Sequence, residues 1–280
     1  MVLSSWLFFP DATENFWDRL KSGFKKNSDS NNKETPVFNE TPNPGNDTEA
    51  GVSEKLLVAN WHINEFTRRQ AVDFDGLRYY SSIMSDYDLV FVQGINDRSG
   101  IAFDYLCSYM PDDYECSFSY ESQTGSQQGV FYKDSVELRD WKVYTGSEDV
   151  WVNTLARASF VWNGVSFKVF NVVIDEDKAR QEIKALSDIA SSEQGNVLVL
   201  GDLKADCGYY SQVFGGDFIG WNWVIENDAR TNVLGSRCAY DRILFNNEFY
   251  EYYEESGVRD ENVTSNRAAN YVVWTSIKSR

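Results

Sequence analysis

The chain has 280 residues and a formal net charge of −17, and its 42% hydrophobic and 15% aromatic content is typical of a globular protein that can bury a large core. The acidic balance disfavours a nucleic-acid partner, because binding to the phosphate backbone depends on clustered Lys and Arg. No apolar run approaches the 18 or so residues of a membrane span, so we predict no transmembrane segment.

The first 54 residues predict two segments. Residues 1–26 form an amphipathic helical segment, with Phe16, Leu20 and Phe24 spaced four apart, and this helix either packs on its own domain or docks a partner. The apolar residues 2–9 leave open whether the N-terminus is a signal, an anchor or a docking helix. Residues 27–54 carry three of the five prolines among polar side chains and predict a flexible linker. Glycosylation sequons begin at Asn39, Asn46 and Asn262.

From residue 55 onward, strands and helices alternate in one predicted domain, 55–280. We predict helices at residues 71–84, 101–109 and 178–190. Strands are predicted at residues 56–63, 89–93, 116–120, 129–132, 136–143, 158–162, 165–173, 197–200, 241–245 and 271–277. Asn163 and Gly164 form the signal of a two-residue hairpin between two of these strands. This alternation predicts an α/β (α+β) fold of two mixed sheets packed face to face with helices outside.

The predicted strand at residues 197–200 has the uninterrupted apolar run of a strand buried on both faces. Gly201 ends the run, and Asp202, Lys204 and Asp206 follow at the edge where open α/β sheets usually place their chemistry. A companion strand begins at Asp241. We therefore expect these two strands to form the floor of one site.

Two motifs lie in these strands, GDLKADC at residues 201–207 and CAYDRI at residues 238–243. They resemble the GDFNADC and CAYDRI motifs of the deoxyribonuclease I group of the endonuclease/exonuclease/phosphatase superfamily. The resemblance extends to residues 56–66 and 87–97. It implies a four-layer α/β/β/α sandwich and a disulfide between Cys207 and Cys238, which leaves Cys107 and Cys116 as a second pair. Four free thiols are the alternative.

The resemblance also implies a catalytic apparatus of a divalent cation and two histidines, and this chain departs from it. His62 stands where the family has an Asn ligand, and Gly94 stands where it has a Glu ligand. Lys204 replaces the Asn of GDFN, and Ala269 and Asn270 replace the Asp and His of the family's terminal motif. His62 is the single histidine of the chain. The interpretation is that no catalytic set is intact, and that the following positions are vestigial: His62, Gly94, Asp202, Lys204, Asp241, Ala269 and Asn270.

The cation site is predicted to be lost as well. The Lys204 ammonium would repel a divalent ion, and it could form an ion pair with Asp202 or Asp241 instead. Asp202 and Asp241 are then interpreted as structural supports, and no cofactor is predicted. The alternative is a site for Mg or Ca held by Asp202, Asp241 and His62.

These departures predict a catalytically inactive pseudonuclease that acts as a protein-binding or structural module. One alternative is a divergent metal-dependent phosphodiesterase or nuclease using Asp202, Asp241 and His62. A second is an acidic decoy or inhibitor of a basic protein. A protein partner would bind through residues 1–26 or through the acidic, aromatic stretch 246–260, whose alternative is a strand and turn with one buried aromatic face. The paired cysteines and the family resemblance favour a secreted or extracellular location.

Overall fold

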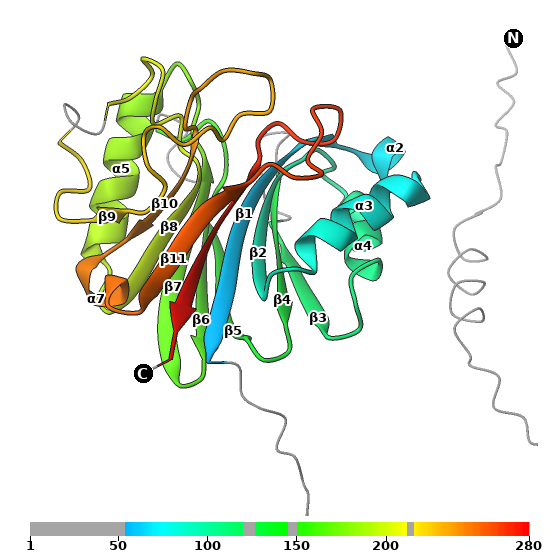
Figure 1. The fold of residues 1–280 in the computed structure, drawn as a ribbon, viewed down its shortest axis with the longest axis horizontal. Helices are drawn as coiled ribbons and strands as arrows, with labels where there is room; N and C mark the ends of the chain where they lie inside the picture. The colour runs from blue at the N-terminus through cyan, green and yellow to red at the C-terminus, as the bar shows by residue number, and fades with distance from the viewer. Residues whose placement is uncertain (1–53, 120–126, 145–149, 212–215, 280) are drawn as a thin grey trace, which may run out of the picture. The chain divides into compact units, whose positions relative to one another are not determined.

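The computed structural model describes residues 54–119, 127–144, 150–211 and 216–279. These residues form two six-stranded sheets with helices on the outside (Figure 1). The predicted segments 1–26 and 27–54, with Asn39 and Asn46, lie outside the described residues except at Glu54. Asn262 is described and exposed, in a turn with a positive φ of 63°.

The first sheet has the strand order β11-β12-β1-β2-β4-β3. Its strands are β1 (Lys55–Phe66), β2 (Leu89–Ile95), β3 (Tyr114–Phe118), β4 (Gln127–Lys133), β11 (Tyr253–Arg259) and β12 (Val272–Lys278). Neighbouring β1 and β2 are parallel, and the other pairs are antiparallel.

The second sheet has the strand order β5-β6-β7-β8-β10-β9. Its strands are β5 (Glu137–Tyr144), β6 (Leu155–Trp162), β7 (Val165–Val173), β8 (Asn196–Asp202), β9 (Asn222–Trp223) and β10 (Asp241–Phe245). Only β7 and β8 pair in parallel. The predicted hairpin joins β6 to β7, and both of its turn residues, Asn163 and Gly164, have the positive φ that such a turn requires.

Three apolar clusters define four layers. One cluster packs α3 (Phe74–Met84) and α4 (Ile101–Ser108) on the outer face of the first sheet. A second lies between the sheets, and a third packs α5 (Ala179–Ser192) on the outer face of the second sheet. Figure 1 shows α5 and the pair α3 and α4 on opposite sides of the sheets. The predicted sandwich of two mixed sheets with outer helices is confirmed.

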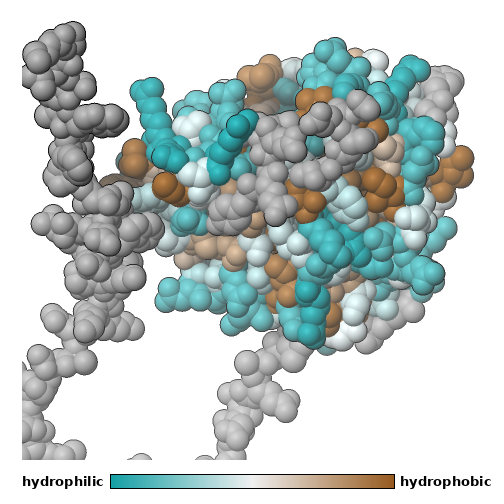
Figure 2. Space-filling view, turned by 180° about the vertical axis from the view of Figure 1, so that it is seen from behind, coloured by the Kyte–Doolittle hydropathy of each residue, from teal (hydrophilic) through white to brown (hydrophobic). Residues whose placement is uncertain are grey.

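The stretch 246–260 forms a short helix, α7 (Asn247–Tyr250), and the edge strand β11. Phe249 is fully buried between the sheets, whereas Tyr250 is 40% exposed. Part of this aromatic stretch therefore belongs to the core. The binding of a protein partner to its exposed residues stays a prediction. Hydrophobic residues are scattered among hydrophilic ones over the face seen in Figure 2. No helix of the described residues is long and apolar enough to cross a membrane.

Both predicted disulfides form, Cys107–Cys116 and Cys207–Cys238, so the alternative of free thiols is wrong. Their sequence separations are 9 and 31 residues. Because a disulfide restricts the unfolded chain more when it closes a longer loop, the Cys207→Ser, Cys238→Ser double variant should lose about 3–4 kcal/mol of unfolding free energy. The matched double variant at Cys107 and Cys116 should lose about 3 kcal/mol. Urea unfolding of both variants would measure the difference, and a larger loss for the shorter loop would contradict this account.

Candidate functional site

The core between the sheets turns polar at one end. Val58, Phe91, Val169, Leu200 and Ile243 belong to the apolar cluster between the sheets. Because side chains two residues apart share a face of a strand, the next inward position on each strand continues this surface. Those positions hold polar residues that are at most 1% exposed: Asn60, Gln93, Asn171, Asp202 and Asp241. We call these five residues the polar layer.

His62 lies one further step along β1, and its side chain is 18% exposed at the edge of the polar layer. Its Nδ1 is 2.9 Å from Oδ2 of Asp202, which ends β8. Asn270 Nδ2 donates to the same oxygen at 3.1 Å. The segment before β12 is fixed to β1, since the backbone N–H groups of Ala269 and Asn270 both donate to the His62 carbonyl. His62 and Asp202 therefore form a dyad held by the chain around Asn270.

The charge of Asp202 determines the state of the imidazole. Burial alone would raise the pKa of Asp202, but the hydrogen bond from His62 and the nearby Lys204 ammonium lower it below the ordinary Asp value. An ionised carboxylate can only accept hydrogen bonds, so His62 Nδ1 carries the proton. In the neutral imidazole the lone pair is then on Nε2, which is the arrangement of a general base.

Lys204 lies beside the dyad, at a left-handed backbone position with a φ of 49°. Its Nζ is 3.2 Å from Asp202 Oδ2 and 3.3 Å from Glu176 Oε1. It also lies 4.5 Å from the centre of the Tyr240 ring. The predicted ion pair with Asp202 is thus present. Burial would lower the pKa of Lys204, but the Asp202 and Glu176 carboxylates raise it, so the ammonium stays charged.

Gly94 lies against the dyad from the neighbouring strand β2. Its φ is 82°, and an added Cβ would be 2.1 Å from the Ile63 carbonyl oxygen and 2.9 Å from His62 Cδ2. A side chain at this position would therefore require the backbone to move. The His62 ring lies directly against the position where the family pattern has its Glu.

Asp241 pairs with Asp202 across β10 and β8 but has the opposite pKa shift. Burial and the Asp202 anion raise the pKa of Asp241 well above its ordinary value, although Lys204 opposes this. Asn60 Nδ2 donates to Asp241 Oδ1 at 3.1 Å, and among the described residues Oδ2 has no hydrogen-bond partner. We infer that Asp241 holds a proton and that Asp202 carries the negative charge of the pair.

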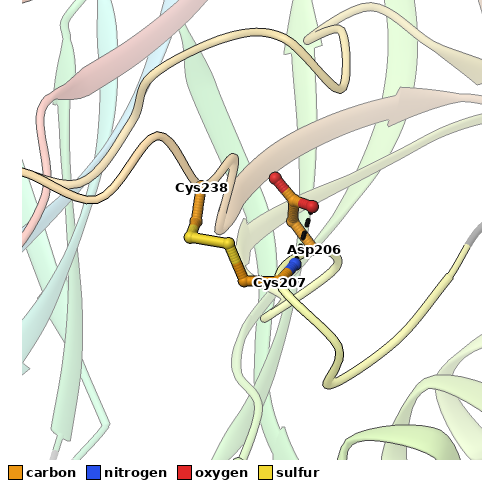
Figure 3. Close-up of side chains that lie close together, drawn as sticks. All are labelled: Asp206, Cys207 and Cys238. Atoms are coloured by element: carbon orange, nitrogen blue, oxygen red, sulfur yellow. Dashed lines mark hydrogen bonds between the residues drawn. A yellow bond between two sulfur atoms is a disulfide. The ribbon is translucent and has the colours of Figure 1, made fainter.

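Among the described residues, the candidate metal ligands His62, Asp202 and Asp241 do not bring one ligand atom each within 4.8 Å of one another. In the described part of the chain, only Asp206, Cys207 and Cys238 bring three potential ligand atoms within 4.8 Å of one another. Figure 3 shows that the two sulfur atoms of that group are joined in the disulfide, and that the Cys207 N–H donates to Asp206. Sulfur atoms in a disulfide are not thiolate ligands. A hard divalent ion prefers oxygen ligands, and the disulfide group offers only the Asp206 carboxylate.

The sequence did not reveal Asn60, Gln93 and Asn171 as part of this region. Gln93 Nε2 donates to the Val172 carbonyl oxygen at 2.8 Å and to Asn171 Oδ1 at 2.5 Å, which joins the two sheets. The sequence does contain a pattern that points to them, because each of these polar residues follows apolar residues at the inward positions of its strand. Reading strands by their inward positions would have found them.

In sequence, the chain is similar to deoxyribonucleases. No family model matches the chain. The chain is 25% identical to chicken (Gallus gallus) deoxyribonuclease-1 over 222 residues, covering 69% of this chain and 78% of the relative. It is 26% identical to human (Homo sapiens) deoxyribonuclease-1-like 2, covering 70% and 79%.

Solved structures share the fold at lower identity. A humanised zebrafish (D. rerio) TDP2 matches with a TM-score of 0.65 and 13% identity, covering 81% of this chain and 100% of that one. A mannosyl-6-phosphatase of Bacteroides thetaiotaomicron matches with a TM-score of 0.59 and 12% identity, covering 79% and 98%.

The prediction that the chain is not an enzyme is contradicted by these relatives, which are named as deoxyribonucleases. The physical reason lies in the dyad. A comparison of motifs counted His62 as a lost Asn ligand and did not show that its ring reaches Asp202, 140 residues away. The chain is therefore similar in sequence to deoxyribonuclease-1, and it shares the fold of TDP2 and of an endonuclease/exonuclease/phosphatase family protein from Bacteroides thetaiotaomicron.

Proposed function

We propose that this chain hydrolyses phosphate esters and that His62, oriented by Asp202, is its general base. The observation that carries the proposal is the 2.9 Å contact between His62 Nδ1 and an ionised, buried carboxylate. Such a contact fixes the ring and leaves Nε2 to accept a proton. The sequence relatives, which are named deoxyribonucleases, support phosphate esters as the substrate class.

The residues of the site have distinct roles in this reaction. His62 Nε2 takes a proton from water as the water oxygen attacks phosphorus, and Asp202 stabilises the imidazolium that forms. The phosphorus–oxygen bond to the leaving group breaks, and the leaving oxygen takes a proton from solvent. His62 then returns its proton to solvent. Asn270 donates a hydrogen bond to the Asp202 carboxylate, and the fully buried Asp241 lies beside it on the neighbouring strand β10.

The family implies a divalent cation, which would polarise the phosphoryl oxygens. In this chain the donors that would hold it are Asp202, Asp241 and His62, and among the described residues their ligand atoms do not all lie within 4.8 Å of one another. Gly94 supplies no carboxylate. The residues present do not fit the cation, so no step of the mechanism is assigned to it.

The net charge of −17 bears on the kind of ester. A strongly acidic protein repels the phosphate backbone of a polymer, whereas one small ester can be bound by a local cation such as Lys204. We therefore expect a small phosphate ester as the substrate. The two disulfides support an oxidising, extracellular setting.

Hydrolysis assays on the purified chain test the proposal. We expect turnover of p-nitrophenyl phosphate or bis-p-nitrophenyl phosphate, and little cleavage of plasmid DNA. Each assay is run with chelator, Mg²⁺, Mn²⁺ and Ca²⁺ in separate arms, with the His62→Gln variant as the control for a contaminating hydrolase. Absence of turnover in every arm, or equal turnover by the variant, would contradict the proposal.

A further inference from the structure

The Lys204 ammonium lies beside the dyad of His62 and Asp202. Lys204 Nζ and His62 Nδ1 contact the same oxygen, Asp202 Oδ2, at 3.2 and 2.9 Å. The Lys204 side chain is 15% exposed, so it lies at the rim of the site and not beneath it. An anion bound to this ammonium would therefore lie close to the dyad.

We propose that Lys204 replaces a divalent cation, so that the site binds a phosphate group without any metal. This inference rests on the proposed function for its substrate class. The replacement is chemically sufficient, because an ammonium offers up to three N–H donors and a full positive charge to phosphoryl oxygens. Lys204 would then be a catalytic residue that stabilises negative charge developing on those oxygens.

The charges at this site also disfavour the binding of a divalent cation. Asp202 Oδ2 already accepts from three groups, His62, Asn270 and Lys204. Like charges repel, and the repulsion is twice as large for a doubly charged ion, so the Lys204 ammonium opposes the binding of a divalent cation beside it. Lys204 and a cation thus compete for one carboxylate, and Lys204 is covalently part of the chain.

The Glu176 carboxylate competes with a bound phosphate group for the Lys204 ammonium. This carboxylate lies 3.3 Å from Lys204 Nζ and is 50% exposed, in the connection between β7 and α5. A phosphate group that binds Nζ must displace this carboxylate or share the ammonium with it. Removing the charge of Glu176 should therefore strengthen anion binding, whereas removing the charge of Lys204 should abolish it.

The test is calorimetric binding of inorganic phosphate, and of orthovanadate, to the full chain in the presence of chelator. The wild type should bind, and adding Mg²⁺ should leave the affinity unchanged. The Lys204→Met variant should bind about 10- to 100-fold more weakly, which corresponds to the 1.5–3 kcal/mol of a hydrogen bond to a charged group. The Glu176→Gln variant should bind several-fold more tightly, and its gain cannot come from misfolding.

The matched control is Lys184→Met. Lys184 also pairs with a carboxylate, that of Asp188 at 2.7 Å, but it lies on α5 and is 65% exposed. This variant should bind phosphate as the wild type does. Binding that requires Mg²⁺ or Mn²⁺, or that survives Lys204→Met, would overturn the inference. Metal-free binding without turnover would refute the proposed hydrolysis but not this site. Turnover that occurs only with metal would refute the metal-free site but not the proposed hydrolysis.

Discussion

Replacing His62 by Gln should lower kcat for phosphate-ester hydrolysis by about 10²- to 10⁴-fold, the usual contribution of a positioned general base. Glutamine can still donate a hydrogen bond to Asp202, so the anchor is kept while the basic nitrogen is lost. KM should change little, because His62 acts on the attacking water and not on the ester. Steady-state kinetics of the two proteins would measure both constants.

Two controls separate a lost base from a damaged fold. The His62→Gln variant should unfold at nearly the same temperature as the wild type. The His62→Gly variant should regain part of its rate when imidazole is added to the buffer, since the missing group is then supplied from solution. Rates within about twofold of the wild type for His62→Gln would mean that His62 is not the base.

Asparagine substitutions at Asp202 and Asp241 should move stability in opposite directions, although the two residues pair directly across β8 and β10. Asp202→Asn removes the buried carboxylate that pairs with the partly buried Lys204 ammonium, and should cost about 3 kcal/mol at neutral pH. Asp241→Asn removes a carboxyl group that is costly to ionise in its buried position, and should stabilise the fold by about 1–3 kcal/mol. Urea unfolding near pH 7 would measure both.

The pH dependence of each variant has a definite sign. The lowered pKa of Asp202 contributes stability above the ordinary Asp pKa, and this is lost as the pH falls through the folded-state pKa. The raised pKa of Asp241 contributes stability below the ordinary Asp pKa, and this is lost as the pH rises toward its folded-state pKa. Asp202→Asn should therefore weaken the pH dependence of the unfolding free energy below the ordinary Asp pKa. Asp241→Asn should weaken that dependence above the ordinary Asp pKa. Equal destabilisation by both variants at neutral pH would contradict the inferred charge states.

Much of the fold could be predicted from local patterns. The apolar run of β8 and the turn at Asn163 and Gly164 are features that a few neighbouring residues fix. The two-residue strand β9 was missed, because it is too short for a period and is held only by its pairing with β10. The four-residue helices α2 (Arg68–Ala71) and α7 were missed for the same reason of length.

The site was only partly predictable. Asp202 and Asp241 could be found because each adjoins the apolar run of its strand. The contact of Asn270 with Asp202 joins residues 68 positions apart, and no local pattern records it. The role of His62 depended on a similar distant contact, so a motif comparison alone led to the wrong conclusion that the chain is not an enzyme.

The protonation state of His62 tests the account most directly. Because the chain has one histidine, a ¹⁵N-labelled sample gives the signals of a single imidazole. In the neutral imidazole we expect the proton on Nδ1 and a bare Nε2, with this tautomer lost in Asp202→Asn. A proton on Nε2 with a bare Nδ1 in the wild type would show that Asp202 does not orient the ring, and that His62 cannot act as the base described here.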